Sequence, residues 1–298
     1  MTESDTPRPS LVSTLKEMGQ DRSLLVMLLL GLAAGLPWAV LTGTLNAWFT
    51  ETNVDVATIG VLSWIGLAYA FKFLWSPGLH RSVAPVTGGL GARRGWMLLF
   101  QAVVMVSLGV IALSDPTTDL PRIALVALVG VIASASQDIV IDAWRIEVAR
   151  DSDHLDALSV IYQFGYRAAT FIGGFVALTL AARLGWNVTF GFLAVMMALG
   201  FVGVALAQEP ERDEDESDGA VRLGANLPPA TRYGALFIVL AGWVAAFAAL
   251  GWFMAQTVTQ AEPPDARGFI RHRGPWIVTV TVLVPAIVAA ILLRLDRR

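Results

Sequence analysis

The chain has 298 residues, of which 55% are hydrophobic and 15% charged, and its mean hydropathy is +0.63. This composition excludes an ordinary soluble domain, in which about a quarter of the residues are charged. The net charge of −3 is small and gives no sign of a nucleic-acid partner. The sequence has no cysteine, which excludes disulfides, thiol catalysis and cysteine-ligated metals. We therefore expect an all-α polytopic membrane protein.

Apolar stretches of about 20 residues, enough to cross a bilayer, recur along the chain. The stretch between Arg22 and Glu51 carries no charge and predicts a first span, which Pro37 is expected to kink. Five further spans of the same bundle are expected at 56–75, 95–114, 123–144, 157–182 and 184–208. Two more are expected at 233–254 and 275–293.

These spans predict four parts of the chain. They are a cytoplasmic amino-terminal tail (1–22), a six-helix amino-terminal transporter bundle (23–208), an acidic cytoplasmic linker (209–232) and a two-helix transmembrane hairpin with a short basic tail (233–298). Placing the amino terminus in the cytoplasm puts most of the 21 lysines and arginines on the inner side. The positive-inside rule therefore predicts that both termini are cytoplasmic.

An internal repeat relates the two halves of the predicted six-helix bundle. Asn46-Ala47-Trp48 closes the first span and Asp142-Ala143-Trp144 closes the fourth. Beyond them, the second and fifth spans each carry a cation preceded by a tyrosine: Tyr69 with Lys72, and Tyr166 with Arg167. Such recurrence is typical of the 3+3 inverted repeat nested in each half of a major facilitator transporter.

Several strings resemble the AmpG family of muropeptide permeases, over about residues 20 to 210. They are Gly35-Leu36-Pro37, Phe71-Lys72-Phe73-Leu74-Trp75-Ser76-Pro77, Arg93-Arg94-Gly95-Trp96, Ser134-Ala135-Ser136-Gln137-Asp138-Ile139-Val140-Ile141-Asp142-Ala143 and Gly165-Tyr166-Arg167. The resemblance implies a secondary transporter in the inner membrane that imports anhydro-muropeptides, small sugar-peptides from the cell wall, with protons. Acetyl-coenzyme A transporters share related strings, so an acyl-coenzyme A or another anionic solute stays open as the substrate.

Two departures from the family pattern affect what the chain is expected to do. His80-Arg81 stands where superfamily members place an Asp-Arg pair, so the acid of a gating cluster is missing. The chain also ends after the eighth predicted span, whereas the family closes its cavity with a second six-helix bundle. We expect either such a second half or a homodimer partner. The alternative is a truncated or partner-dependent membrane protein without transport activity of its own.

The intramembrane charges predict a substrate or proton pathway. Asp138, Asp142 and Arg145 follow each other at helical spacing on one face of the fourth span. Lys72 and Arg167 come from neighbouring spans, and an unpaired charge costs about 3 kcal/mol at the bilayer centre, so we expect these five charges to meet. In the functional interpretation, Asp138 or Asp142 takes up a proton while Arg167 and Lys72 bind substrate carboxylates; Gln137 and Tyr166 are also candidates. The alternative is that the charges are static clips between helices.

The remaining candidates serve gating, stacking or packing. Arg145, Arg81, Arg93 and Arg94 are candidates for a cytoplasmic gate cluster, although such residues more often orient the protein and attract anionic lipid. Trp38 and Trp64 lie deep enough in their spans to be candidates for contact with a sugar ring. Gly31 and Gly35 predict close helix packing. We expect no catalytic residue, metal or cofactor, because His80, His154 and His272 lie far apart in different loops.

Overall fold

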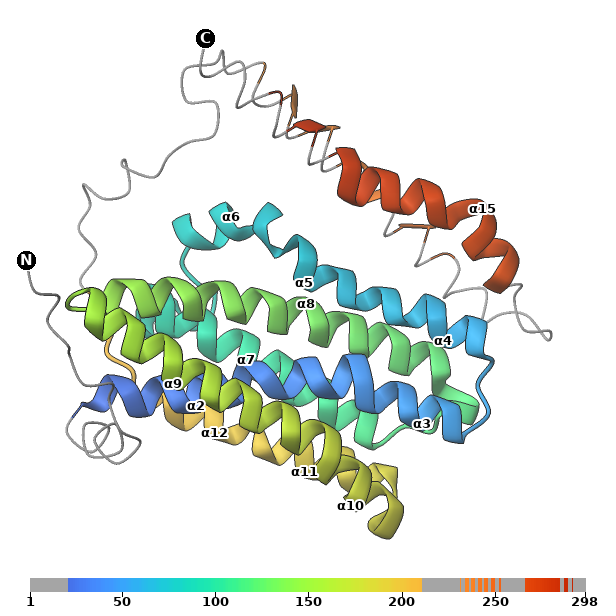
Figure 1. Cartoon of the computed structure of the whole chain (residues 1–298), viewed down its shortest axis with the longest axis horizontal. Coiled ribbons are helices and arrows are strands. Elements are labelled where there is room, and N and C mark those ends of the chain that lie inside the picture. The colour runs from blue at the N-terminus through green and yellow to red at the C-terminus, as the bar shows by residue number, and fades with distance from the viewer. Residues whose placement is uncertain are drawn as a thin grey trace, which may run out of the picture. The chain divides into compact units, whose positions relative to one another are not determined.

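The computed structural model describes residues 21–210 and 266–284, with positions scattered over 231–252 and at 287, 288 and 291. Every regular element within these residues is a helix (Figure 1). Five of the helices are long and apolar enough to cross a membrane, which confirms the polytopic all-α class. Residues 1–20 of the predicted tail (1–22), residues 211–230 of the predicted linker (209–232) and half of the seventh predicted span fall outside the described residues. The eighth predicted span is described only in part, by the end of α15 (Ala266–Val278) and a π-helical turn at Thr279–Leu283.

The helices follow the predicted spans closely. The first span is α2 (Arg22–Ala39), a π-helical turn (Val40–Thr44) and α3 (Leu45–Glu51), so its irregularity comes directly after Pro37. The third and fourth spans are α7 (Ala92–Ala112) and α8 (Pro116–Val148). The fifth combines α9 (Ser152–Phe171), a π-helical turn (Ile172–Val176) and α10 (Ala177–Leu184). The sixth combines α11 (Trp186–Met196) and α12 (Ala198–Leu206).

The second span is interrupted instead of forming one helix. It consists of α4 (Val56–Leu62), a 3₁₀ turn (Ser63–Gly66), α5 (Leu67–Phe71) and a second 3₁₀ turn (Lys72–Leu74), after which α6 (Ser76–Arg81) begins. Pro77 lies in the first turn of α6, where its missing N–H is tolerated and a continuous helix through it is not. The break places Lys72 in a tight turn beside the end of α5.

The chain divides into two compact units. The first comprises Met1–Trp48, Ile65–Asp115 and Leu125–Pro210, and the second comprises Phe49–Trp64, Pro116–Ala124 and Glu211–Arg298. All the charged side chains discussed below belong to the first unit.

Within the first unit, α2 and α9 pack at very short range because glycines meet backbone. A Cβ atom at Gly35 would lie 2.5 Å from the carbonyl oxygen of Tyr166, and one at Gly165 would lie 2.5 Å from that of Leu28. A larger residue would therefore push the two backbones apart. The predicted packing role of the glycines in α2 is confirmed.

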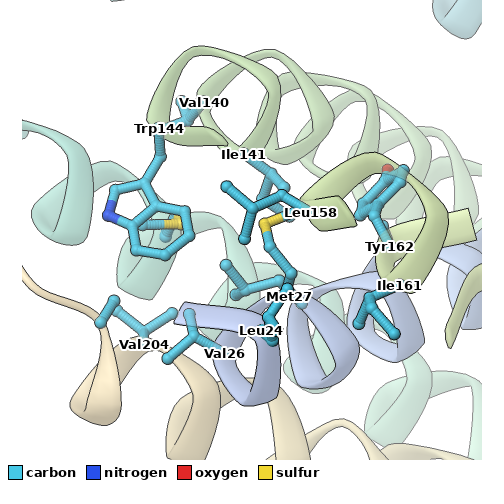
Figure 2. Packing of buried hydrophobic residues seen from close by; sticks show 14 of the residues in the cluster. Leu24, Val26, Met27, Val140, Ile141, Trp144, Leu158, Ile161, Tyr162 and Val204 are labelled. Carbon is cyan, nitrogen blue, oxygen red and sulfur yellow. The ribbon is translucent and has the colours of Figure 1, made fainter. Parts of the chain in front are cut away.

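A buried apolar cluster joins α2 and α9 to α8 and α12. Met27 of α2, Ile141 and Trp144 of α8, Leu158 of α9 and Val204 of α12 all belong to it (Figure 2). In a bilayer such contacts stabilise by close packing, because lipid tails are as apolar as the side chains. This cluster makes the first unit a bundle that holds α8 in a defined orientation.

Candidate functional site

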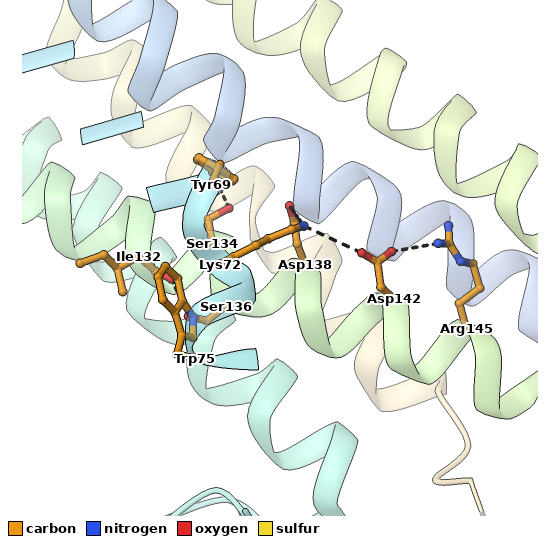
Figure 3. Close-up of polar contacts among 9 residues, drawn as sticks. All are labelled: Tyr69, Lys72, Trp75, Ile132, Ser134, Ser136, Asp138, Asp142 and Arg145. Carbon is orange, nitrogen blue, oxygen red and sulfur yellow. Dashed lines mark hydrogen bonds and ion pairs between the residues drawn. The ribbon is translucent and has the colours of Figure 1, made fainter. Parts of the chain in front are cut away.

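Four charged side chains form a continuous series of ion pairs, here called the charge chain: Lys72, Asp138, Asp142 and Arg145 (Figure 3). Lys72 Nζ lies 3.4 Å from Asp138 Oδ2 and 3.9 Å from Asp142 Oδ2. Asp142 Oδ1 lies 3.0 Å from Arg145 Nη2. Three of the four residues are on one face of α8, as their spacing predicts, and the broken second span supplies the cation.

The two carboxylates of the charge chain differ in burial. The side chain of Asp138 is 9% exposed, whereas that of Asp142 is 41% exposed. Oδ1 of Asp138 is buried and accepts no hydrogen bond from any residue that the structure describes. A buried carboxylate oxygen without a donor is costly, and a proton on Asp138 would remove the charge that causes the cost. Asp138 is therefore the member of the chain best placed to hold a proton.

Two hydrogen bonds fix the broken span against α8. Tyr69 Oη donates to Ser134 Oγ (2.8 Å), and Trp75 Nε1 donates to Ser136 Oγ (2.9 Å). Ser136 Oγ in turn donates to the carbonyl oxygen of Ile132 (2.7 Å), as Figure 3 shows. Trp75, Ser134 and Ser136 thus come from the same two sequence strings as Lys72, Asp138 and Asp142, and Tyr69 lies just before the first of them. We had not predicted these two serines, although their alternation with alanine before Asp138 was a signal.

Arg145 has a second contact besides its ion pair. Its guanidinium carbon lies 5.3 Å from the centre of the Tyr162 ring, within the range of a cation–π interaction. The end of the charge chain is therefore anchored to α9.

Arg167 does not join the charge chain. Its side chain is exposed on α9, and it forms no ion pair with any residue in the described part of the protein. Its neighbours on the same face of the helix are the exposed apolar side chains of Val160, Phe164 and Phe171. The structure thus brings together four of the five charges that we expected to meet.

Gln137 bonds to a neighbouring helix, whereas the ring of Tyr166 lies beside another ring of its own helix, α9. Gln137 is buried and donates from Nε2 to Gln101 Oε1 of α7 (2.6 Å), and Gln101 donates to the carbonyl oxygen of Met197. Tyr166 is half-buried, with its ring centre 6.2 Å from that of Tyr162. Gln137 precedes Asp138 in the sequence and Tyr166 precedes Arg167. Neither side chain forms a hydrogen bond with the charge chain among the described contacts.

A second cluster, here called the Arg93 cluster, consists of Arg93, Glu147, His80 and Glu209. Arg93 is buried and pairs with both carboxylate oxygens of Glu147 at the end of α8, with a distance of 2.9 Å from Nε to Oε2. Its Nη2 also lies 2.8 Å from Nδ1 of His80. Glu209 accepts hydrogen bonds from the backbone N–H groups of Arg93 (2.8 Å) and Arg94 (3.0 Å), and so caps the start of α7.

The Arg93 cluster contains two acids, although the loop after the second span supplies neither. The loop after the second span has His80 in place of an aspartate, but α8 and the segment after α12 supply Glu147 and Glu209. Sequence spacing did not reveal either glutamate, since each is far from Arg93 along the chain. Arg94 donates from Nε to the carbonyl oxygen of Val204 (3.3 Å). Arg81 is the last residue of α6, and its side chain lies outside what the structure describes.

The two candidate tryptophans lie in different surroundings. Trp38 is 37% exposed, and its ring packs edge to face against Tyr69 with 4.7 Å between the ring centres. It therefore adjoins the residues that position Lys72. Trp64 lies in the 3₁₀ turn between α4 and α5 and is half-buried. Among the residues described, there is no group of three or more histidines and carboxylates that would hold a metal ion.

Comparison with known proteins shows relatives that match about two thirds of the chain. The chain matches no protein-family model. It is 40% identical over 197 residues to a protein of Escherichia coli K12 named anhydromuropeptide permease, covering 66% of this chain and 39% of that protein. It is 37% identical over 198 residues to an uncharacterized protein of Haemophilus influenzae (66% and 46%), and 28% identical over 194 residues to the putative transporter AmpG 4 of Rickettsia felis (64% and 47%). The chain thus spans less than half the length of these relatives.

Proposed function

The chain belongs to the AmpG-type permease family, and from this premise we propose that it forms part of a secondary transporter. Its substrate is an anhydro-muropeptide, which moves inward across the inner membrane together with protons. The proposed fold is one half of a major facilitator transporter, with both termini in the cytoplasm. A second six-helix bundle, from a partner chain or a second copy, completes the cavity.

The burial and the incomplete pairing of Asp138 are the observation that carries this proposal. A membrane helix places its carboxylate in a buried position, with one oxygen 3.4 Å from Lys72 and the other without a hydrogen bond among the described residues. Ionisable groups inside membranes are costly, and they commonly mark proton and substrate pathways. The charge chain supplies both an acid for the proton and cations for an anionic solute.

Lys72 connects the binding of the proton with the binding of the substrate. In the structure it holds Asp138 and, less closely, Asp142. A substrate carboxylate that pairs with Lys72 leaves Asp138 without its cation, and a proton then neutralises the buried acid. Proton and substrate binding therefore support each other, as symport requires.

Arg167 provides a second anchor in this proposal. It is exposed among apolar side chains of α9 and has no described carboxylate partner. Facing lipid at this depth, a cation would cost about 3 kcal/mol or more. A substrate carboxylate that reaches Arg167 through the cavity removes that cost and adds a charge-assisted hydrogen bond.

The test is a chimera in which the matched residues of this chain replace those of the Escherichia coli permease, in cells that lack their own permease. We expect it to take up labelled anhydro-muropeptide, and uptake to stop when the proton gradient is dissipated. Arg167→Ala should reduce this uptake at least tenfold while membrane insertion is kept, because the second anchor is lost. The matched control is Arg183→Ala, an exposed arginine at the end of α10. Normal uptake by Arg167→Ala contradicts its binding role, and a well-inserted chimera without uptake contradicts the proposed function.

A further inference from the structure

A cavity of about 180 Å³ lies at one end of the first unit, apart from the charge chain and the Arg93 cluster. It forms where α2 and α9 begin and where α8 and α12 end. Its rim is formed by Arg22, Arg150 and His154, and the apolar residues Val26, Trp144 and Leu206 line one side of it. We call it the basic pocket.

Asp21 organises the polar side of the basic pocket. Its Oδ2 lies 2.5 Å from Arg150 Nη2 and 3.2 Å from His154 Nε2. Ser23 donates to Asp21 from its backbone N–H (2.9 Å) and its hydroxyl (2.5 Å). Burial raises the pKa of Asp21, but the hydrogen bonds from Ser23 and the charge of Arg150 outweigh this and lower its pKa. Asp21 is therefore a carboxylate at neutral pH and holds both side chains at the rim.

The rim keeps a positive charge after this pairing. Arg22 and Arg150 carry two positive charges against the single negative charge of Asp21. The backbone N–H of Arg150 donates to Nδ1 of His154 (3.2 Å), which leaves Nε2 as the ring donor that faces Asp21 and Ser23. The side chain of Arg150 is 69% exposed. Its guanidinium group has five N–H donors, and the contact with Asp21 is made through Nη2 alone. Arg22 is exposed as well. Both guanidinium groups are therefore accessible to an anion from outside.

The apolar side of the basic pocket is rigid. Val26 and Trp144 are almost completely buried in the cluster that joins α2, α8, α9 and α12. Trp144 is fixed further, because its Nε1 donates to the carbonyl oxygen of Gln208 (2.8 Å). An anion with a short apolar part next to its charge would gain contacts on this side of the pocket that a small soluble anion lacks.

The location of the basic pocket selects the kind of molecule. The helices that form it are membrane spans, and the pocket lies at their ends, so it is at the level of the lipid headgroups. We infer that the basic pocket binds the phosphate headgroup of an anionic phospholipid. Arg22 and Arg150 hold the phosphate by charge-assisted hydrogen bonds, and Leu206 contacts the adjoining glycerol carbons.

The experiment measures the thermal unfolding of the full chain, purified in a non-ionic detergent, as single ligands are added. We expect phosphatidylglycerol to raise the unfolding temperature, and phosphatidylcholine or inorganic phosphate at the same concentration to leave it unchanged. Arg22→Gln should weaken the apparent affinity for phosphatidylglycerol about tenfold, the effect of losing one charge-assisted hydrogen bond. Arg183→Gln, an exposed arginine at the other end of the bundle, should leave it unchanged.

Three results would overturn the inference. One is equal stabilisation of the unsubstituted chain and Arg22→Gln by phosphatidylglycerol, and another is equal loss of stabilisation in Arg22→Gln and Arg183→Gln. The third is a full effect of inorganic phosphate alone, which would identify a site for a free anion. Arg22→Gln is preferred to Arg150→Gln because it leaves the ion pair with Asp21 intact. Retention of phosphatidylglycerol by each variant, measured by native mass spectrometry, gives a second readout that does not depend on unfolding.

Discussion

At the scale of single residues, the burial and the pairing of Asp138 support its proposed role in proton exchange. Asp138 has one cationic neighbour at 3.4 Å and one buried oxygen without a described hydrogen bond. Glu147, by contrast, accepts hydrogen bonds from Arg93 with both of its carboxylate oxygens. Asp138 and Glu147, both acids of α8, therefore differ in how completely a cation pairs with them.

This contrast predicts the effect of Asp138→Asn in the chimera with the Escherichia coli permease. Asparagine has the same shape but cannot take up a proton, so proton-driven accumulation of anhydro-muropeptide should fall at least tenfold. Exchange of labelled for unlabelled substrate at equal concentrations, which needs no net proton movement, should be kept. Asp156→Asn, an exposed acid near the start of α9, serves as the matched control and should accumulate normally. Accumulation by Asp138→Asn with unchanged dependence on the proton gradient would remove Asp138 from the coupling path.

At the scale of elements, the distance between α2 and α9 determines the geometry of the first unit. These two helices carry the glycines that meet backbone, and α9 also carries Arg167 and the ring of Tyr162 that contacts Arg145. Any side chain at those glycines separates the helices. The position of Arg167 and Tyr162 relative to the charge chain therefore depends on the absence of a Cβ atom at these glycines.

Gly165→Ala is expected to destabilise the protein. Its Cβ would lie 2.5 Å from a backbone oxygen of Leu28, which cannot rotate away, so overpacking should cost about 1–3 kcal/mol. Gly191→Ala is the matched control, since nothing lies within 4 Å of a Cβ at that position in α11. There the better helix propensity of alanine should be neutral or stabilise by up to about 1 kcal/mol. Thermal unfolding in detergent compares the two variants, and an equal unfolding temperature for both would contradict the close approach of the helices.

At the scale of the whole molecule, the first unit presents an exposed face of α9 that suits neither lipid nor water. It combines Arg167 with Val160, Phe164 and Phe171. The chain spans 39% of the length of the Escherichia coli permease. In the proposed transporter, the second bundle covers this face and turns it toward the substrate pathway.

Crosslinking tests whether a second copy can take that place. The chain has no cysteine, so a single introduced cysteine reports its own neighbours. If this chain transports unaided, Phe164→Cys on the exposed face of α9 should form crosslinked dimers in membranes. Val195→Cys, equally exposed but on α11, should not. A chain that stays monomeric with both substitutions cannot transport by pairing with itself and would need a separate second half.

The sequence by itself determined membrane residence, the positions of the spans and the shared face of Asp138, Asp142 and Arg145. Hydropathy and helical spacing are local properties, and a stretch of about 20 residues contains all the information they require. The motif strings likewise pointed to the permease family before any contact was known.

Only the tertiary structure decided which charges meet. The break in the second span puts Lys72 beside Asp138, and the packing of α2 on α9 leaves Arg167 outside the charge chain. Glu147 and Glu209 reach Arg93 from segments distant in sequence, and the basic pocket exists because four helix ends converge. Such distances depend on how helices pack against one another, and helix packing is a property of residue pairs far apart along the chain.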